Sequence, residues 1–289
     1  MTSRPSVPPV SPSPRNIMII GDNPTIESVV ADCVPFADWH LLRAADNSIA
    51  LAIAEKCCCE LILTNRKSSG GEGVSLLRSL QHRQSKAKLI ILAAESRTQD
   101  VVQAMRGYAF SYFSRSYSDE LLAEMLRWAV EAVNWEDGIE IVSGLPNWLQ
   151  ARVRCDFDSA DRFLQFLREL IAGVPAEVVH SMMLSAREIL LNAVEYGGAL
   201  DSRKTVEYSC FRTSRFLACV VRDPGEGFRL HDLPQAAIQN PLENPTRHVT
   251  YRLEHGLRPG GFGILMAKQH LDELVYNEKG NEALLIKYI

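Results

Sequence analysis

Short apolar runs alternate with helical hydrophobic patterns through residues 16–134 of the chain. The runs are too short for helices and are separated by turns, so they predict β-strands joined by α-helices. Strands that alternate with helices form a parallel sheet covered on both faces, here a flavodoxin-like, doubly wound α/β domain. The predicted strands are Ile17–Ile20, His40–Arg43, Leu61–Leu63, Leu89–Leu92 and Tyr112–Phe113, and the predicted helices include Ile26–Cys33, Ser48–Cys58 and Asp119–Val133.

The order of elements changes after residue 145. Two helical patterns come early, and most later segments predict strands, two of which flank a short turn and form an antiparallel hairpin. A few helices beside a mostly antiparallel sheet predict an α+β sandwich over residues 146–289. The expected strands are Trp148–Cys155, Thr205–Phe211, Phe216–Arg222, Leu274–Asn277 and Ala283–Ile289, and the expected helices are Ser159–Ile171, Pro175–Tyr196 and Gly263–Glu273.

Two segments carry no sustained hydrophobic pattern. Residues 1–15 are rich in proline and serine, and we expect them to form a disordered tail. Residues 135–145 mix acidic side chains with Gly138 and Gly144, and we expect them to link the two domains.

Composition and charge narrow the class of protein. At 289 residues the chain can hold two domains with separate cores, and 46% hydrophobic and 23% charged residues are typical of a soluble globular protein. A net charge of −4 gives no long-range attraction to nucleic acid or to a membrane surface. No apolar run approaches the ~18 residues of a membrane span, and no signal pattern opens the chain. Seven cysteines without disulfide or zinc spacing indicate a reduced, cytoplasmic location.

The helical pattern over residues 175–196 carries a carboxylate and an amide on one face. Glu188 and Asn192 are four residues apart, so their side chains project in the same direction. A carboxylate there can accept a proton from an attacking hydroxyl, and an amide oxygen can complete the coordination of Mg²⁺. Taken alone, the pair also fits the polar face of an ordinary amphipathic helix.

Two glycine-rich segments follow this helix. Asp223 ends a predicted strand and is followed by Gly225 and Gly227, which allow the backbone to approach a flat ring. Gly261 and Gly263 precede a predicted helix whose free N–H groups can face a phosphate. Each segment alone also fits a simple glycine-rich turn. In this order and spacing, they suggest a nucleotide site.

The first domain resembles the receiver domain of bacterial response regulators. The likeness covers residues 16–134 and rests on the layout and on short motifs at Ile19–Pro24, Leu61–Asn65, Gly70–Gly73 and Tyr112–Ser118. It implies a phosphorylation site at the ends of the strands, but the residues expected there are replaced. Asn65 stands in place of the nucleophilic Asp, Gly21 in place of one of two acidic residues (Asp22 is kept), Ala93 in place of Thr or Ser, and Arg115 in place of Lys.

These replacements predict a pseudo-receiver. An amide is a poor nucleophile and holds no charge to bind Mg²⁺, so aspartyl phosphorylation is not expected. The domain then has two possible roles. It is either a structural or dimerising module, using an exposed face near Phe110, Tyr112, Tyr117 and the last helix of the domain, or a docking surface for a partner.

The second domain resembles the GHKL-type ATP-binding fold over residues 140–289. Among its branches, the likeness is closest to the anti-sigma-factor serine kinases of bacterial partner-switching systems. Four segments carry it. They are Ser185–Gly197, which resembles the family's N box, Asp223–Phe228, its adenine-contacting box, Gly261–Leu265, its last glycine box, and Leu271–Leu274 after it.

The resemblance assigns a role to each candidate residue. It makes Glu188 the general base, places Asn192 on Mg²⁺, and gives Asp223 the adenine of ATP. Residues 229–259 become a lid over the phosphates, from which Arg258 or Arg247 reaches the γ-phosphate. The pocket is shaped by Gly225, Gly227, Gly261 and Gly263.

Two functions remain open from the sequence. The leading one is a cytoplasmic Mg²⁺- and ATP-dependent Ser/Thr kinase, expected to be a homodimer, that phosphorylates an anti-anti-sigma protein of the STAS type. The alternative is a nucleotide-dependent scaffold that sequesters a sigma factor or another partner with little kinase activity. Autophosphorylation on histidine is disfavoured, because His180 lies inside the nucleotide domain and no two-helix hairpin is predicted before it.

Overall fold

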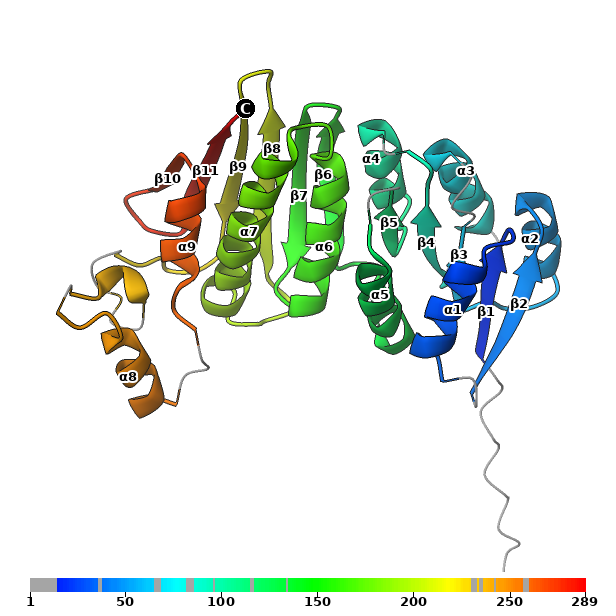
Figure 1. Ribbon diagram of the computed structural model, residues 1–289, viewed down its shortest axis with the longest axis horizontal. Helices are drawn as coiled ribbons and strands as arrows, with labels where there is room; N and C mark the ends of the chain where they lie inside the picture. Colours follow the sequence, from blue (N-terminus) through cyan, green and yellow to red (C-terminus); the bar gives the residue numbers. More distant parts are fainter. Residues whose placement is uncertain are drawn as a thin grey trace, which may run out of the picture.

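The computed structural model describes residues 15–35, 38–64, 69–81, 86–95, 97–114, 117–133, 135–229, 233, 236–241, 243–256 and 260–289. The expected tail, apart from Arg15, lies outside these residues. So do three of the candidate side chains, Asn65, Arg115 and Arg258. Two β-sheets lie side by side along the molecule, each with its own helices (Figure 1).

The first sheet has five strands, which are β1 (Arg15–Ile20), β2 (Trp39–Ala44), β3 (Leu61–Leu63), β4 (Lys88–Leu92) and β5 (Ser111–Phe113). All its strand pairs are parallel, in the order β2-β1-β3-β4-β5. The helices are α1 (Pro24–Cys33), α2 (Asn47–Ala54), α3 (Gly70–Gln81), α4 (Thr98–Arg106) and α5 (Asp119–Glu131).

Successive residues of the interior strand β1 point to opposite faces of this sheet. Ile17 and Ile19 pack with α1 and α5, whereas Met18 and Ile20 pack with the core under α2, α3 and α4. Both faces are therefore covered, and the predicted flavodoxin-like doubly wound fold is confirmed.

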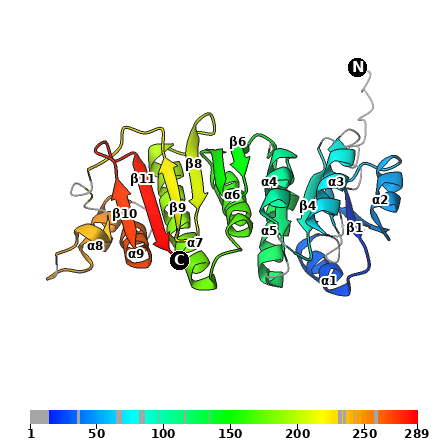
Figure 2. The ribbon, with the colours of Figure 1, turned by 90° about the horizontal axis from the view of Figure 1, so that it is seen from above.

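The second sheet is antiparallel, in the order β10-β11-β9-β8-β7-β6. Its strands are β6 (Ile139–Leu145), β7 (Trp148–Arg154), β8 (Thr205–Arg212), β9 (Phe216–Arg222), β10 (Glu273–Tyr276) and β11 (Glu282–Tyr288). Helices α6 (Phe157–Leu170), α7 (Ala176–Asn192) and α9 (Gly263–His270) lie on one face of this sheet, and none of the helices formed by the described residues covers its other face (Figure 2). The predicted α+β layout is confirmed.

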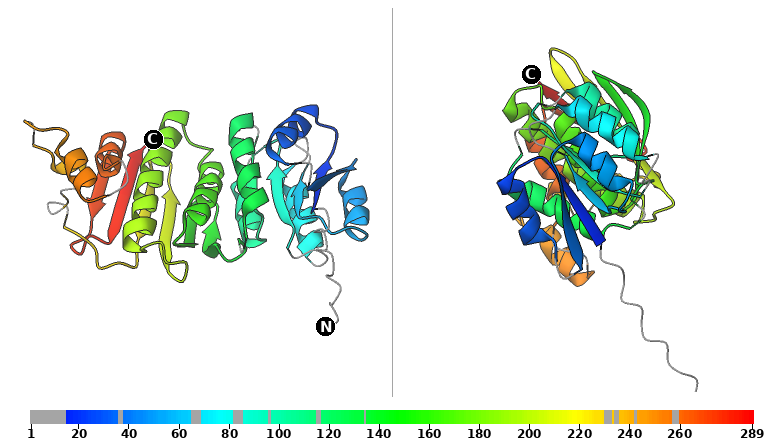
Figure 3. Two further views of the ribbon diagram at one scale, coloured as in Figure 1. Left: turned by 90° about the horizontal axis from the view of Figure 1, so that it is seen from below. Right: turned by 90° about the vertical axis from the view of Figure 1, so that its right-hand side faces the viewer.

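Between β9 and α9 the chain leaves the sheet. It forms a short 3₁₀ turn, Ala237–Gln239, and helix α8 (Arg247–Glu254), which lies at the end of the molecule far from the first sheet (Figure 3). Within the described residues, no helix is long and apolar enough to cross a membrane.

Part of the predicted linker is wrong. Residues 139–145 form β6, the edge strand of the second sheet, and only residues 132–138 separate it from α5. A register shift between Ile141 and Ser143 interrupts the alternation of buried and exposed residues. That bulge, with Gly144, hides the strand pattern from the sequence.

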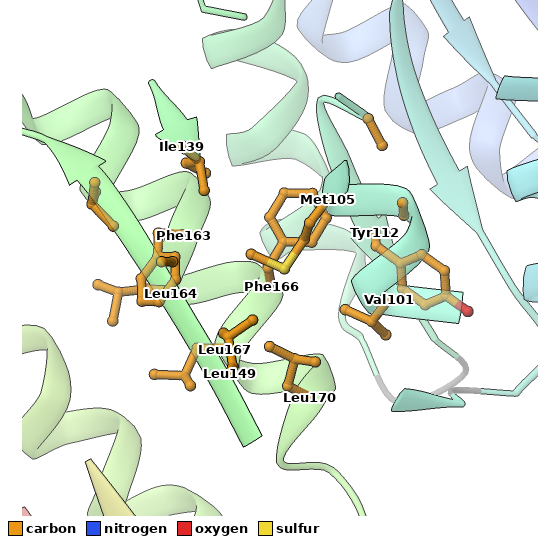
Figure 4. Packing of buried hydrophobic residues seen from close by; sticks show 14 of the residues in the cluster. Val101, Met105, Tyr112, Ile139, Leu149, Phe163, Leu164, Phe166, Leu167 and Leu170 are labelled. Carbon is orange, nitrogen blue, oxygen red and sulfur yellow. The ribbon is translucent and has the colours of Figure 1, made fainter. Parts of the chain in front are cut away.

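The two domains share a continuous core. Buried residues of α4 and β5 belong to the same cluster as those of α6 and β7, and Figure 4 shows the α6 side chains between the two sets. The exposed face predicted near Phe110, Tyr112 and Tyr117 is wrong, because these side chains are 0%, 0% and 8% exposed. Phe110 packs edge-on against Trp135 of the joint, and Tyr112 faces α4 and α6.

Candidate functional site

A cavity of about 750 Å³ opens on the helical side of the second domain. It lies between α7, the start of α9 and the loop that follows β9. Apart from Arg247, every described residue that was predicted for the nucleotide site lines it, namely Glu188, Asn192, Asp223, Gly225, Gly227, Gly261 and Gly263. The structure therefore brings together segments that are far apart in the sequence.

Helix α7 provides one wall of the cavity. Glu188 and Asn192 are one turn apart on the face that lines it. The first residue of α9, Gly263, lies directly against Glu188, and a β-carbon at this position would collide with its Oε2. The glycine lets the start of α9 approach α7 closely, and a larger residue at this position would push the Glu188 carboxylate aside.

The same helix changes pitch at its end. Ala193–Gly197 form a π-helical turn, in which the N–H of Gly198 donates to the Ala193 carbonyl at 2.8 Å. This turn carries Tyr196 into the cavity wall and places Gly197 against the Asp223 carboxylate, where a β-carbon would collide with it. Since π-helical turns are often found at functional sites, this one agrees with a binding role.

Asp223 is held at the opposite end of the cavity by its neighbours in the chain and the sheet. Its Oδ1 accepts from the Gly225 N–H at 2.8 Å, and its own N–H donates to the Asn281 carbonyl at 2.9 Å. Partial burial raises the pKa of Asp223, while the Gly225 N–H and the nearby Lys279 oppose the rise. A desolvated carboxylate that faces a cavity favours a ligand that donates a hydrogen bond to it.

The cavity is mainly apolar between these two ends. Phe228 and Tyr276 meet edge-to-face with their ring centroids 5.1 Å apart, and both line the cavity. A flat, uncharged group fits such a lining better than a charged one does. The other apolar lining residues include Ile189, Ala193, Val221, Leu233, Ile264, Met266 and Ala283.

Positive charge enters the cavity from two residues that the sequence reasoning missed. Lys204, just before β8, and Arg252 of α8 both line it. Arg252 is 5% exposed, and its Nη2 donates to Tyr196 Oη at 3.3 Å. Of the two arginines predicted to reach the phosphates, Arg247 is exposed and does not line the cavity, and Arg258 lies outside the described residues.

The segment that carries Arg252 is anchored to the start of α9. His248, one turn earlier on α8, is fully buried, and its ring packs edge-on against Phe262 with the centroids 4.4 Å apart. The backbone N–H of His248 donates to Asn240 Oδ1 at 3.0 Å. These contacts fix Arg252 over the cavity. The sequence does contain a pattern that points to Arg252, because His248 and Arg252 are four residues apart and would lie on the same face of a helix.

The side chains in the cavity offer few atoms that could bind a metal ion. A metal ion there would be coordinated mainly by the bound nucleotide and by water. Within the described part of the chain, no three His, Cys, Asp or Glu side chains cluster closely enough to bind a metal ion. Asn192 and Glu188 offer oxygen atoms from adjacent turns, which suits Mg²⁺ completed by phosphates and water.

The first domain offers little chemistry at the corresponding ends of its strands. Gly21 follows β1 and donates to the Ala44 carbonyl, Asp22 is exposed, and Ala93 after β4 is buried and donates to the Phe113 carbonyl. Of the three, Asp22 alone carries a carboxylate. Asn65 and Arg115, the other two residues predicted for this site, lie outside the described residues.

Comparison with known sequences divides the chain in the same way. The model of the histidine kinase-like ATPase domain matches residues 153–287, and that of the response regulator receiver domain matches residues 17–127. The chain is also similar to the probable transcriptional regulatory protein TcrX of Mycobacterium tuberculosis. The two are 19% identical over 180 residues, which cover 62% of this chain and 75% of that protein.

Similar solved structures are receiver domains. One, from an HD domain-containing protein of Pseudomonas fluorescens, is 19% identical, with a TM-score of 0.35 over 41% of this chain and 95% of that one. Another, from Methanospirillum hungatei, is 22% identical, with a TM-score of 0.35 over 41% of this chain and 96% of that one. The domain matches and the site geometry together describe an ATP-binding signalling protein with a receiver domain and a histidine kinase-like ATPase domain.

Proposed function

We propose that this chain is a Mg²⁺- and ATP-dependent protein Ser/Thr kinase of the anti-sigma-factor type, acting on an anti-anti-sigma partner of the STAS type. One observation carries the proposal. The Glu188 carboxylate lines the same cavity as Asn192 and Asp223, and Gly263 at the start of α9 lies directly against it. ATP is the cofactor that this arrangement favours, with its adenine at Asp223 and its phosphates near Glu188 and Arg252.

The length of the cavity wall agrees with this orientation. Gly197, which touches Asp223, comes nine positions after Glu188, and at ~1.5 Å per residue the two ends of the wall lie roughly 13 Å apart. An extended nucleoside triphosphate spans a comparable distance. Lys204 and Arg252 then add positive charge to the cavity in which the triphosphate lies.

Transfer to a separate protein is favoured over autophosphorylation on histidine. The joint between α5 and β6 is short, so no pair of dimerising helices lies between the two domains. His180 is exposed on α7, the helix that also carries Glu188, and its ring packs edge-on toward His270 with the centroids 6.4 Å apart. A rigid helix prevents His180 from reaching a phosphate bound beside Glu188.

The proposed reaction is a direct displacement at the γ-phosphorus. The partner's Ser or Thr oxygen forms a bond to phosphorus, the bond to the β,γ-bridging oxygen breaks, and ADP leaves. Glu188 accepts the hydroxyl proton, and Arg252 balances charge on the phosphoryl oxygens. Bound Mg²⁺, with Asn192 as its protein ligand, would neutralise phosphate charge.

A labelling experiment tests the kinase. The purified chain is mixed with Mg²⁺, ATP labelled on its γ-phosphate and candidate STAS-type proteins, and acid-stable label on Ser or Thr is measured. Glu188→Gln should lose the label and still bind ATP, whereas the exposed Glu177→Gln on the same helix should behave as wild type. Chelation of Mg²⁺ should abolish transfer. Label that persists in Glu188→Gln would rule out the proposed base.

A second candidate function rests on the first domain. Its phosphorylation site has lost the residues needed for chemistry, so the chain tolerates such losses and could act as a nucleotide-dependent scaffold for a sigma factor or another partner. ATP binding without label on any partner, together with partner capture that differs between ATP and ADP, would favour the scaffold. For either function we propose a homodimer and neither a nucleic-acid nor a membrane partner, and sedimentation of the purified chain tests the oligomeric state.

A further inference from the structure

Helix α6 is buried on two sides, although it carries a polar stripe. Its apolar residues Phe163 and Leu167 pack in the core of the second domain. On the side of the first domain it presents Arg162, Gln165 and Glu169, each 4% exposed. Buried polar groups are costly unless they are paired, so this stripe must be matched by the first domain.

Arg162 is matched by backbone carbonyl groups. Its guanidinium donates to the carbonyls of Phe110 at 3.0 Å, Ala109 at 3.4 Å and Trp135 at 2.8 Å. It also lies over the rings of Phe110 and Trp135, 4.6 and 5.0 Å from their centroids. Burial lowers the pKa of Arg162 to about 10, so the side chain is still charged at neutral pH. A single charged side chain thus joins α6, the start of β5 and the joint.

Gln165 continues the same contact along β5. Its Nε2 donates to the Tyr112 carbonyl at 3.0 Å. Strand β5 is the edge of the first sheet, and an edge strand presents unpaired backbone groups. Helix α6 covers this edge and satisfies its carbonyls with side chains, so the first domain is bound through hydrogen bonds of fixed direction.

A neighbouring side of α6 contacts helix α7, one wall of the nucleotide cavity. Asp161, next to Arg162, forms an ion pair with Arg187 of α7, and Arg187 precedes Glu188. Helices α6 and α7 also pack against each other through the shared core. Adjacent residues of one helix therefore contact the receiver domain and the helix that carries the proposed base.

We propose that the receiver domain and the ATPase domain form one cooperative unit, in which α6 links occupancy of the nucleotide site to the stability of β5 and α4. The link to nucleotide rests on the proposed ATP binding, whereas the cooperative unit does not. Because binding free energies are reciprocal, a partner that stabilises the receiver domain will also raise nucleotide affinity.

The cooperative unit is tested without nucleotide. Hydrogen exchange of the full chain in increasing urea reports separately on β1 and β3 and on β8 and β9. The wild type should show one shared midpoint, and Arg162→Met/Gln165→Leu should show two. Arg168→Met is the matched control, since Arg168 is exposed on the same helix. Separate midpoints in the wild type would overturn the proposal. Should the double variant not fold, Gln165→Leu alone replaces it.

The link to nucleotide is tested by adding MgATP to the same proteins. In the wild type and in Arg168→Met, exchange should slow in α7 and α9 and also in β5 and α4. In the double variant only α7 and α9 should respond. Protection restricted to α7 and α9 in the wild type contradicts the link. No protection in α7 and α9 refutes ATP binding itself, and the urea midpoints then decide the cooperative unit.

Discussion

Gly263 lies so close to Glu188 that a β-carbon at position 263 would collide with the Glu188 Oε2 atom. This contact joins the first residue of α9 to the proposed base on α7. It gives the glycine a role beside the proposed base, where the sequence alone suggests only a phosphate-facing turn.

Gly263→Ala should therefore displace the Glu188 carboxylate. Overpacking of this kind costs roughly 1–3 kcal/mol of stability. A displacement of about 1 Å at a reacting group can lower turnover ~100-fold. We expect the rate of phosphoryl transfer, measured by labelling, to fall strongly. The thermal midpoint, measured by calorimetry, should fall only slightly. Gly71→Ala on α3 is the control, because a β-carbon there meets nothing closer than 3.8 Å, and it should leave transfer unchanged.

Asp223→Ala should weaken ATP binding and relax the choice of base. A hydrogen bond to a charged group contributes ~1.5–3 kcal/mol, so titration calorimetry should show a loss of about 10- to 100-fold in ATP affinity. GTP lacks the exocyclic amine that adenine has at this position, so the affinity for GTP should change little. Glu278→Gln on the exposed turn before β11 should leave both affinities unchanged. Equal losses for ATP and GTP would contradict the assignment of adenine to Asp223.

Asp223→Asn should stabilise the ligand-free protein at neutral pH. The raised pKa of Asp223 means that its ionised form is disfavoured in the folded state, mainly because of burial. The folded protein therefore holds the proton more tightly than the unfolded chain, and this contribution favours folding only at low pH. It is lost as the pH rises through the folded-state pKa, which lies above 3.8.

Urea unfolding at several pH values measures how the stability difference between the asparagine variant and the wild type depends on pH. The amide removes the penalty of a buried charge, so its advantage over wild type should be present at neutral pH and should shrink below pH 3.8. An asparagine variant that is less stable than wild type at neutral pH would show that the carboxylate contributes structure beyond its charge.

Arg252→Ala should weaken binding of ATP more than binding of adenosine. The guanidinium enters the cavity beside Tyr196, and a charge-assisted bond to phosphate contributes about 1.5–3 kcal/mol. We expect a loss of about 10- to 100-fold for ATP and almost none for adenosine, as measured by calorimetry. Arg247→Ala, at the exposed start of the same helix, is the control. Similar losses for adenosine would show that Arg252 only holds α8 in place.

The sequence predicted both sheets and most of the site because each rests on local pattern. The apolar alternation of β8 and β9 and the spacing of Glu188 and Asn192 are visible within single segments. Their meeting in one cavity was suggested by the order of the segments and by resemblance, since spacing along a chain does not measure distance in space.

The sequence could not predict contacts between the domains or within residues 229–259, the segment expected to form a lid. Arg162 and Gln165 are spaced as on the solvent-exposed face of a helix. That face is buried only because it packs against the edge strand β5 of the first domain. Arg252 was passed over in favour of Arg258 and Arg247, because the lid has no periodic core to set its register. Strand β6 was read as a linker because of its bulge and Gly144.

Acetyl phosphate should leave the chain unmodified in the first domain. The resemblance to receiver domains implies that Asn65 stands in place of the nucleophile, and of the described residues expected at this site only Asp22 has a carboxylate, which is exposed after β1. Neither an amide nor a single carboxylate can both bind Mg²⁺ and accept a phosphoryl group. Intact mass and peptide mapping should therefore show no added phosphate after incubation with acetyl phosphate and Mg²⁺. Asn65→Asp is the informative variant, because Gly21 and Ala93 remain, and it too should stay unmodified. Phosphate on Asp22 would show that the receiver site keeps chemistry despite its substitutions.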